Sequence, residues 1–194
     1  MLHSPAFIGR KMTWKIQINR IIGLAVVFFT LLATPARADD IVGQASVVDG
    51  DTIEIHGTRI RLWGIDAPES TQLCRSEDSN LYQCGRAAAT ALAGLLWAIK
   101  RPVSCSSVAQ DQYGRTVATC SLGTPGRPDI GQWLVVNGHA LDWPLYSKGK
   151  YADAQRGAEK GERGIWSGSF VEPWRYRACV KVGGRPAACS DDAN

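Results

Sequence analysis

The sequence predicts an α+β fold, and three observations support that class. Short segments with alternating apolar and polar residues fill positions 41–65 and 103–122. Segments with helical character lie between and after them, without the regular crossovers of a parallel sheet. Setting aside the first 38 of the 194 residues leaves 156, which suits one domain with a sizeable core. A small closed barrel is one arrangement that removes the exposed edges of such a sheet.

Residues 1–38 have the three parts of an export signal. Four basic residues and no acidic one precede the apolar run Ile21–Ala33, and a PARA segment ends at Ala38, before the expected cleavage at Asp39. The run has 13 residues, against the roughly 20 that span a bilayer, which favours cleavage over an uncleaved anchor. Met12 is an alternative start. We expect a periplasmic or extracellular protein with no stable membrane association after cleavage.

The predicted elements follow in order. Strands are expected at 41–48, 52–56, 59–65, 103–110 and 115–122. Helices are expected at 85–100, which is rich in Ala and Leu, and at 130–137 and 152–163. Gly64 interrupts the third strand and suggests a bulge. Residues 73–82 read as a polar loop, 124–128 as a turn, and 169–194 as a tail after a domain at 39–168.

Six cysteines, all after residue 38, predict disulfides formed in an oxidising compartment. The expected pairs are Cys74–Cys84, Cys105–Cys120 and Cys179–Cys189. The middle pair is equidistant from the turn DQYGR, so its members would face each other across a hairpin. The other two pairs would each close a loop of about ten residues. A zinc site is the alternative, but the chain has no CxxC pair and no suitably spaced histidines.

Three carboxylates stand among strand-like residues at Asp51, Asp66 and Glu69. Two unit charges 4 Å apart repel by about 4 kcal/mol at an effective dielectric near 20, so converging carboxylates would take up a proton or bind a cation. Hard oxygen ligands suit Ca²⁺ or Mg²⁺ better than zinc. The alternative is that all three are solvated turn residues.

Two arginines favour the functional interpretation. Arg61 lies five residues before Asp66, and Arg115 directly follows the turn DQYG. A guanidinium matches phosphate oxygens and can stabilise the charge of a phosphoryl transition state. The alternative for each is a salt bridge. A cation, a carboxylate that is not a ligand and two arginines are the parts needed for metal-assisted phosphodiester hydrolysis.

The segments DGDTIEI, RLWGIDAPE and DQYGR, in that order, closely resemble the staphylococcal nuclease-like (thermonuclease) family. The resemblance covers about Val42 to Trp166. It implies an OB-type five-stranded β-barrel with about three helices. It also implies Ca²⁺-dependent cleavage of DNA and RNA with low sequence specificity, leaving 3′-phosphate ends.

The resemblance also implies roles for particular residues. Asp51 and Asp66 would bind Ca²⁺ through their side chains, joined by the backbone carbonyl of Ala67. Glu69 would act on the attacking water, as a general base or by orienting it. The scissile phosphate would be held by Arg61 and Arg115, and the nucleotide by Tyr113 and Tyr146, because an aromatic ring stacks on any base.

The sequence departs from the family at a few positions. The hairpin at residues 56–60 is shorter than usual, Ala67 stands where threonine can occur, Gln112 replaces a basic residue, and Pro144 stands where a tyrosine can occur. Trp97, Trp133, Trp143 and Trp166 are expected in the core rather than as ligand platforms.

The net charge of the chain after residue 38 indicates which nucleic acids it would bind. Five of the 22 basic residues lie in the first 38 positions, which leaves 17 against 18 acidic residues, a net charge of −1. Phosphate neutralisation supplies most non-specific affinity for nucleic acid, so short or single-stranded substrates are expected. We expect a monomer. The alternative function is a non-catalytic OB-type module that binds an oligonucleotide or a protein.

Overall fold

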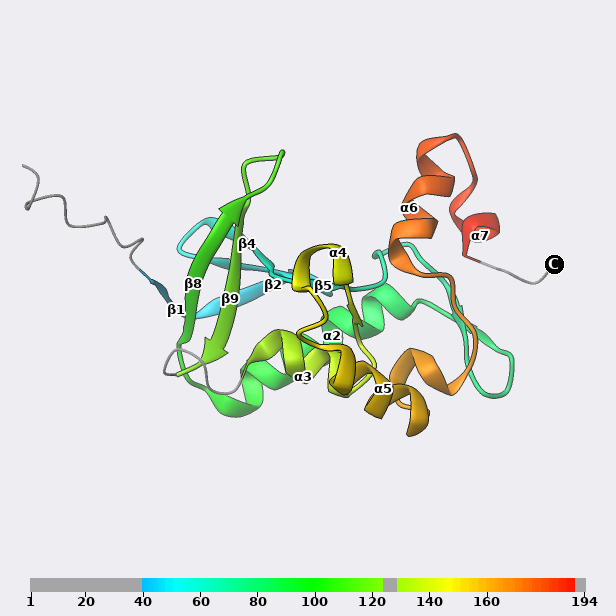
Figure 1. Ribbon diagram of the computed structural model, residues 1–194, viewed down its shortest axis with the longest axis horizontal. Helices are drawn as coiled ribbons and strands as arrows, with labels where there is room; N and C mark the ends of the chain where they lie inside the picture. The colour runs from blue at the N-terminus through cyan, green and yellow to red at the C-terminus, as the bar shows by residue number, and fades with distance from the viewer. Residues whose placement is uncertain (1–39, 124–128, 191–194) are drawn as a thin grey trace, which may run out of the picture. The chain divides into compact units, whose positions relative to one another are not determined.

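The computed structural model describes residues 40–123 and 129–190. The predicted export signal at 1–38 and the predicted turn at 124–128 lie outside these residues. No helix in the described ranges is long and apolar enough to cross a membrane. The described chain has the α+β fold that the sequence predicts, with one main sheet and several helices (Figure 1).

The main sheet contains six strands in the order β1-β8-β9-β4-β3-β2. They are β1 (Ile41–Gly43), β2 (Ala45–Asp49), β3 (Thr52–Ile55), β4 (Thr58–Leu62), β8 (Val103–Gln110) and β9 (Thr116–Leu122). The two end strands, β1 and β2, follow each other in the chain with only Gln44 between them. One bent segment therefore pairs with β8 at one edge and with β3 at the other, which gives the five-segment OB-type arrangement.

The alternation of β3 and β4 sets the inner face of the sheet. Ile53, Ile55 and Ile60 are fully buried, because residues two apart on a strand point to the same side. The turn between these strands uses His56 and Gly57, whose φ angles are 50° and 77°. Both angles are in the left-handed region that closes a two-residue hairpin, so the short connection still joins antiparallel strands.

The β8–β9 hairpin carries one of the three disulfides. Cys105 lies directly opposite Cys120 in the register, and the two are bonded with 4.1 Å between their Cα atoms. Residues 103–105 of β8, at the end away from the turn, are buried, whereas residues 106–110 are exposed. The other two disulfides join Cys74 to Cys84 and Cys179 to Cys189, so all three pairs are those expected from the sequence.

Gly64 is a turn residue and not the bulge predicted from the sequence. Its φ is 75°, and a Cβ atom there would lie 3.1 Å from the Cβ of Ser147. The chain leaves the main sheet at this turn, and β5 (Ile65–Asp66) pairs instead with β10 (Leu141–Asp142). Glycine is therefore required both by the backbone angle and by the close packing.

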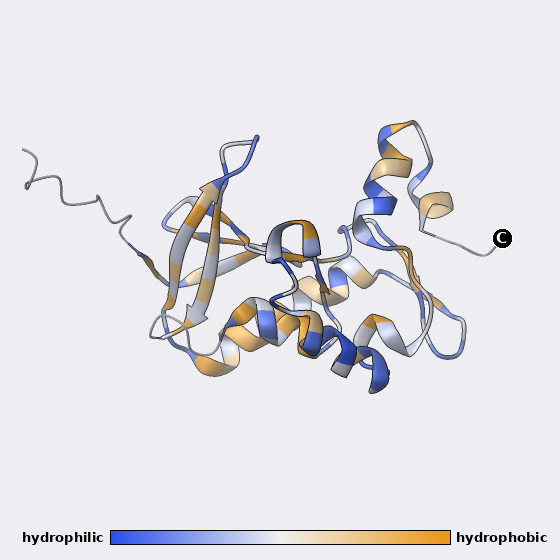
Figure 2. Cartoon of the chain, viewed as in Figure 1, coloured by the Kyte–Doolittle hydropathy of each residue, from blue (hydrophilic) through white to orange (hydrophobic). Residues whose placement is uncertain are grey.

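The three predicted helices are present as α2 (Cys84–Ile99), α3 (Ile130–Val136) and α5 (Ala152–Lys160). Helix α2 buries Ala88 and Leu92 in the core, and α5 is largely hydrophilic (Figure 2). Trp133 and Trp166 pack against buried clusters as expected. Trp97, near the end of α2, is 76% exposed, so its predicted core position is wrong.

Short elements lie in segments that the sequence left as loop or tail. They are β6 (Cys74–Arg75), β7 (Leu81–Tyr82), α4 (Pro144–Ser147), the 3₁₀ helix η1 (Gly164–Ser167), α6 (Pro173–Lys181) and α7 (Pro186–Cys189). A proline begins α4, α6 and α7, where its missing N–H costs no hydrogen bond. The Cys179–Cys189 disulfide joins α6 to α7, and this helical pair forms the tail.

Candidate active site

The β2–β3 turn and the register of β3 with β4 bring Asp51 and Arg61 together. Arg61 lies opposite Thr52, the residue after Asp51. Its Nη1 lies 3.0 Å from Oδ1 of Asp51 and its Nη2 lies 2.9 Å from Oδ2. The hydroxyl of Thr52 donates to the same Oδ1 at 3.0 Å. The contact between acid and arginine is therefore a direct product of strand pairing.

Asp66 ends β5 and is fully buried. Nη2 of Arg61 lies 2.8 Å from its Oδ1, so one guanidinium bridges the two aspartates. The backbone N–H of Ala67 points back to Oδ2 of Asp51 at 3.4 Å. The turn at Gly64 creates this arrangement, because it directs β5 away from the sheet and toward the β2–β3 turn.

Glu69 follows Pro68 and is held through its backbone. Its N–H donates to Oε1 of Gln72 at 3.1 Å. A Cβ atom on Gly85, at the start of α2, would lie 1.9 Å from the Glu69 carbonyl oxygen, so the helix approaches this segment as closely as a glycine allows. The Glu69 side chain is 37% exposed and extends from a fixed backbone.

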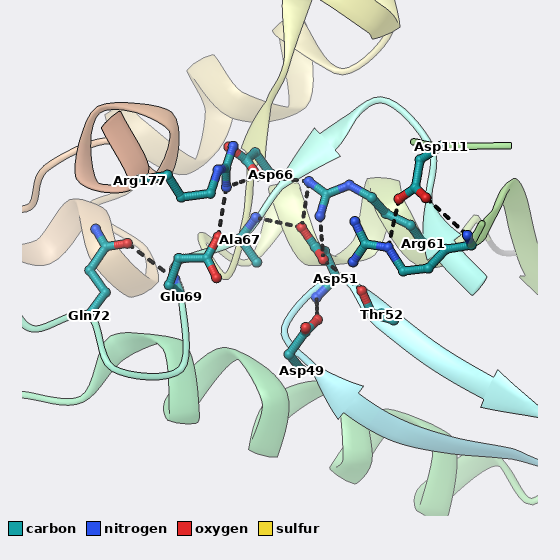
Figure 3. Close-up of polar contacts among 11 residues, drawn as sticks. Asp49, Asp51, Thr52, Arg61, Asp66, Ala67, Glu69, Gln72, Asp111 and Arg177 are labelled. Atoms are coloured by element: carbon teal, nitrogen blue, oxygen red, sulfur yellow. Dashed lines mark hydrogen bonds and ion pairs between the residues drawn. The ribbon is translucent and has the colours of Figure 1, made fainter. Parts of the chain in front are cut away.

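Arg177 of α6 completes the cluster, and sequence reasoning did not assign it there. Its Nη1 and Nη2 donate to Oδ1 and Oδ2 of Asp66 at 2.9 and 2.8 Å, and Nη1 also donates to Oε1 of Glu69 at 2.8 Å (Figure 3). The only sequence signal was the basic and aromatic segment WRYR at 174–177. Five side chains thus form an alternating row of acid and arginine: Asp51, Arg61, Asp66, Arg177 and Glu69.

Burial dominates the electrostatics of Asp51. It raises the pKa of this carboxyl to about 7, because the charged form is poorly solvated; Arg61 opposes the shift, and Asp49 and Asp66 add to it. Burial acts to lower the pKa of Arg61, but Asp51 and Asp66 outweigh it and raise that pKa. Asp51 is therefore only partly ionised near neutral pH, despite its contact with Arg61.

Most of the predicted site residues line one cavity of about 650 Å³. The members are Asp51, Arg61, Ala67, Glu69, Tyr113, Arg115 and Tyr146, together with Trp143 and Arg177. Asp66 is fully buried and touches this set through the two arginines. The cavity is large enough for a nucleotide-sized ligand, since ligand pockets measure about 300–1,000 Å³.

Arg115 stands apart from the row of acids. Its Nε donates to Oδ2 of Asp111 at 2.6 Å, and its guanidinium lies 5.7 Å from the ring centre of Tyr113. Tyr113 is 75% exposed at the hairpin tip. Among the described residues, the two Nη atoms of Arg115 make no hydrogen bond, so they are available to a ligand in the cavity.

Trp143 lines the cavity, and its predicted core position is wrong. Its ring centre lies 5.6 Å from the guanidinium carbon of Arg61 and 5.3 Å from that of Arg177. Tyr146, on α4, packs edge-on against it at 4.5 Å between ring centres. The sequence places Trp143 just after β10, and only the pairing of β10 with β5 brings it to the site.

The oxygen atoms of the site suit a hard cation, but arginines already engage its two aspartates. Asp51, Asp66 and the carbonyl of Ala67 offer oxygen ligands of the kind that Ca²⁺ prefers. Within the described ranges, no three Asp, Glu, His or Cys side chains form a cluster that could hold a metal alone. A carboxylate oxygen has two lone-pair sites, and Oδ1 of Asp66 uses both for Arg61 and Arg177. A cation binding Asp66 must share it with arginine.

Comparisons with known proteins identify the family to which the chain is similar. The sequence model of the family described as staphylococcal nuclease homologue matches residues 59–168. A succinoglycan biosynthesis protein, ExoI, from Rhizobium meliloti (strain 1021) is 42% identical over 148 residues, which are 76% of this chain and 76% of the relative. A micrococcal nuclease from Shigella flexneri is 32% identical over 180 residues, 84% of this chain and 93% of the relative. An uncharacterized endonuclease from Escherichia coli is 29% identical over 154 residues, 76% of this chain and 92% of the relative.

Proposed function

The chain belongs to the staphylococcal nuclease homologue family, and on that premise we propose that it is an exported, Ca²⁺-dependent nuclease. It hydrolyses phosphodiester bonds of DNA and RNA with low sequence specificity and leaves 3′-phosphate ends. The family and its nuclease-named relatives support the general activity. We propose in addition that Ca²⁺ is the cation, that DNA and RNA are the substrates and that the products carry 3′-phosphate ends.

One observation carries the proposal: carboxylates, arginines and aromatic rings share a single cavity. Three acids alternate with two arginines, so the site has places both for a cation and for an anionic phosphate. Tyr113, Trp143 and Tyr146 line the same cavity. Bases stack on aromatic rings without regard to their identity, which suits low sequence specificity.

The cation would be held by Asp51, Asp66 and the carbonyl of Ala67. A bound Ca²⁺ supplies electrostatic stabilisation of the negative charge that develops on the phosphate. Burial raises the pKa of Asp51 to about 7, because the charged form of this carboxyl is poorly solvated. Cation binding favours the ionised form of this carboxyl.

Glu69 acts on the attacking water. As general base its carboxylate takes a proton from the water, whose oxygen bonds to phosphorus while the bond from phosphorus to the 5′ oxygen breaks. The departing 5′ oxygen takes a proton from solvent water, Glu69 returns its proton to solvent, and the 3′ side keeps the phosphate. Arg61 and Arg115 hold the phosphate oxygens, the first from the row of acids and the second from the hairpin turn.

Export is part of the proposal. An export signal at 1–38 would deliver a domain at 39–168 and a tail at 169–194 to a periplasm or to the cell exterior. Three disulfides support an oxidising destination. We propose a monomer that acts on short or single-stranded nucleic acid, because the net charge of −1 after residue 38 gives little attraction to long duplex.

A non-catalytic binding module is the second candidate. The observation in its favour is that arginines already engage the carboxylates of Asp66 and Glu69. A module of this kind would bind an oligonucleotide or a protein in the same cavity and leave it unchanged.

The test is a cleavage assay with defined metals and defined ends. Oxidised protein is incubated with labelled single-stranded DNA, duplex DNA and RNA in Ca²⁺, in Mg²⁺ and in chelator. Cleavage in Ca²⁺ that stops with chelator and leaves 3′-phosphate ends supports the proposal. Binding without cleavage in either metal, by a folded protein, favours the second candidate.

A further inference from the structure

The tail is fastened to the segment that carries Glu69. The side-chain amide of Gln72 donates to the carbonyl of Val171 at 2.6 Å, and Gln72 is fully buried. The same side chain accepts the N–H of Glu69 through its Oε1. One buried amide therefore connects the backbone of Glu69 to the start of the tail.

Two further contacts fix α6 and α7 on this segment. The hydroxyls of Thr71 and Tyr176 lie 2.8 Å apart, and the N–H of Leu73 donates to Oγ of Ser190 at 3.0 Å. Tyr176 is the residue before Arg177 and is 3% exposed. The helix that presents Arg177 is thus held in place by partly buried hydrogen bonds and by its disulfide.

Arg177 restricts the two carboxylates that it touches. Its fork-shaped guanidinium binds both oxygens of Asp66 and one oxygen of Glu69, and the Trp143 ring lies against it at 5.3 Å. A planar guanidinium with several donors fixes the relative orientation of its acceptors. Without it, Glu69 would keep a fixed backbone but a free, partly exposed side chain.

Resting on the proposed function, we propose that Arg177 is a positioning residue of the active site. It holds the Glu69 carboxylate in the orientation needed to act on water. It also shares Asp66 with the divalent cation, whose affinity it lowers because both carry positive charge. The C-terminal tail is therefore part of the active site, and Arg177 makes turnover faster at the expense of cation affinity.

The test compares Arg177→Gln, Arg177→Lys and a matched control, Lys181→Gln, in the full protein with its disulfides formed. Lys181 is exposed at the end of the same helix, so its loss removes one positive charge outside the site. Calcium affinity is measured by titration calorimetry without substrate. The kinetic constants kcat and KM are measured on a single-stranded oligodeoxynucleotide, and circular dichroism checks folding.

We expect Arg177→Gln to bind Ca²⁺ several-fold more tightly and to lose roughly 10- to 100-fold in kcat, with KM changed by less than about threefold. Arg177→Lys keeps the charge but not the fork, so it should stay folded, retain near wild-type cation affinity and recover part of kcat. Lys181→Gln should match the wild type in both measurements.

Three outcomes would overturn the inference. Tighter Ca²⁺ binding with equal or faster turnover in Arg177→Gln would mean that Arg177 only obstructs the cation and does not position Glu69. Weaker Ca²⁺ binding together with slower turnover makes it a support of the fold. Unchanged Ca²⁺ affinity in Arg177→Gln refutes the sharing of Asp66. A wild-type protein that cleaves nothing refutes the proposed function instead, and the calcium titration still decides whether Arg177 and the cation share Asp66.

Discussion

The Nε–H of Arg115 donates to Oδ2 of Asp111 at 2.6 Å, and the two residues flank the turn between β8 and β9. Asp111 also accepts the N–H groups of Tyr113 and Arg115 through its Oδ1. Burial acts to raise the pKa of Asp111, but hydrogen bonds from Arg115 and Tyr113 and the charge of Arg115 outweigh it and lower that pKa. The turn is thus organised around one carboxylate, which sets the direction of the arginine predicted to hold phosphate.

The first prediction concerns this pair. Arg115→Ala should lower kcat/KM by roughly 10²–10³-fold, because a donor to the transition-state charge is lost. Asp111→Ala should lower it by about tenfold, since Arg115 remains but loses its orientation. Steady-state kinetics on one oligonucleotide checks both. If the two variants equalled the wild type, the arginine would serve only to close the hairpin.

The second prediction concerns the pH dependence of stability at Asp51. Burial raises its pKa from 3.8 to about 7. The folded protein therefore binds this proton more tightly than the unfolded chain does. The free energy of unfolding that this binding contributes is fully present below pH 3.8 and is lost as the pH rises through about 7. Asp51→Asn should therefore gain stability relative to wild type between about pH 5 and pH 8, by roughly 2–3 kcal/mol.

Urea unfolding at the two pH values measures this difference. Adding Ca²⁺ to the wild type at the higher pH should restore stability, because the cation binds the ionised form of the folded protein. Stability that moved with pH identically in wild type and variant would show that Asp51 does not titrate in this range.

The third prediction concerns His139, where the pH dependence of stability has the opposite sign to that at Asp51. Burial lowers the pKa of His139, whose ring lies 5.8 Å from that of Trp133. Its contribution is present above its ordinary pKa of 6.5 and is lost as the pH falls, because the unfolded state binds the proton first. His139→Gln should flatten the loss of stability between about pH 7 and pH 5. An unchanged acid slope in denaturant unfolding would contradict this assignment.

The fourth prediction separates two disulfides. Replacing Cys105 and Cys120 by alanine should lower the free energy of unfolding by roughly 2–4 kcal/mol and leave kcat nearly unchanged in the folded fraction. Replacing Cys179 and Cys189 should lower kcat, because α6 presents Arg177 to Asp66 and Glu69. Equal kcat in the two double variants would mean that the disulfide does not hold α6 in place.

The sequence predicted the parts of the site that local pairing creates. Asp51 and Arg61 meet because the β3–β4 register follows from alternation and a short turn. Cys105 and Cys120 meet because they are symmetric about a hairpin turn. Asp66, Glu69 and Arg115 were candidates because of their residue types and positions, and the family resemblance, confirmed by the family match, assigned their roles.

The missed parts depend on contacts between distant segments. Arg177 lies 111 positions from Asp66, and nothing in the spacing of WRYR shows where the tail docks. Trp143 reaches the cavity only because β10 pairs with β5, a pairing set up by the turn at Gly64. Trp97 is apolar yet 76% exposed, because little of the described chain packs on the face of α2 on which it lies.

The central claim is that Glu69 acts on water in a calcium-dependent cleavage of phosphodiester bonds. The most direct measurement compares the single-turnover cleavage rate of single-stranded DNA in Ca²⁺ for wild type, Glu69→Gln and a control, Glu159→Gln, on the exposed face of α5. We predict a fall of roughly 10²–10⁴-fold for Glu69→Gln and none for the control. Equal rates for wild type and Glu69→Gln, with both proteins folded and calcium-bound, would contradict the claim.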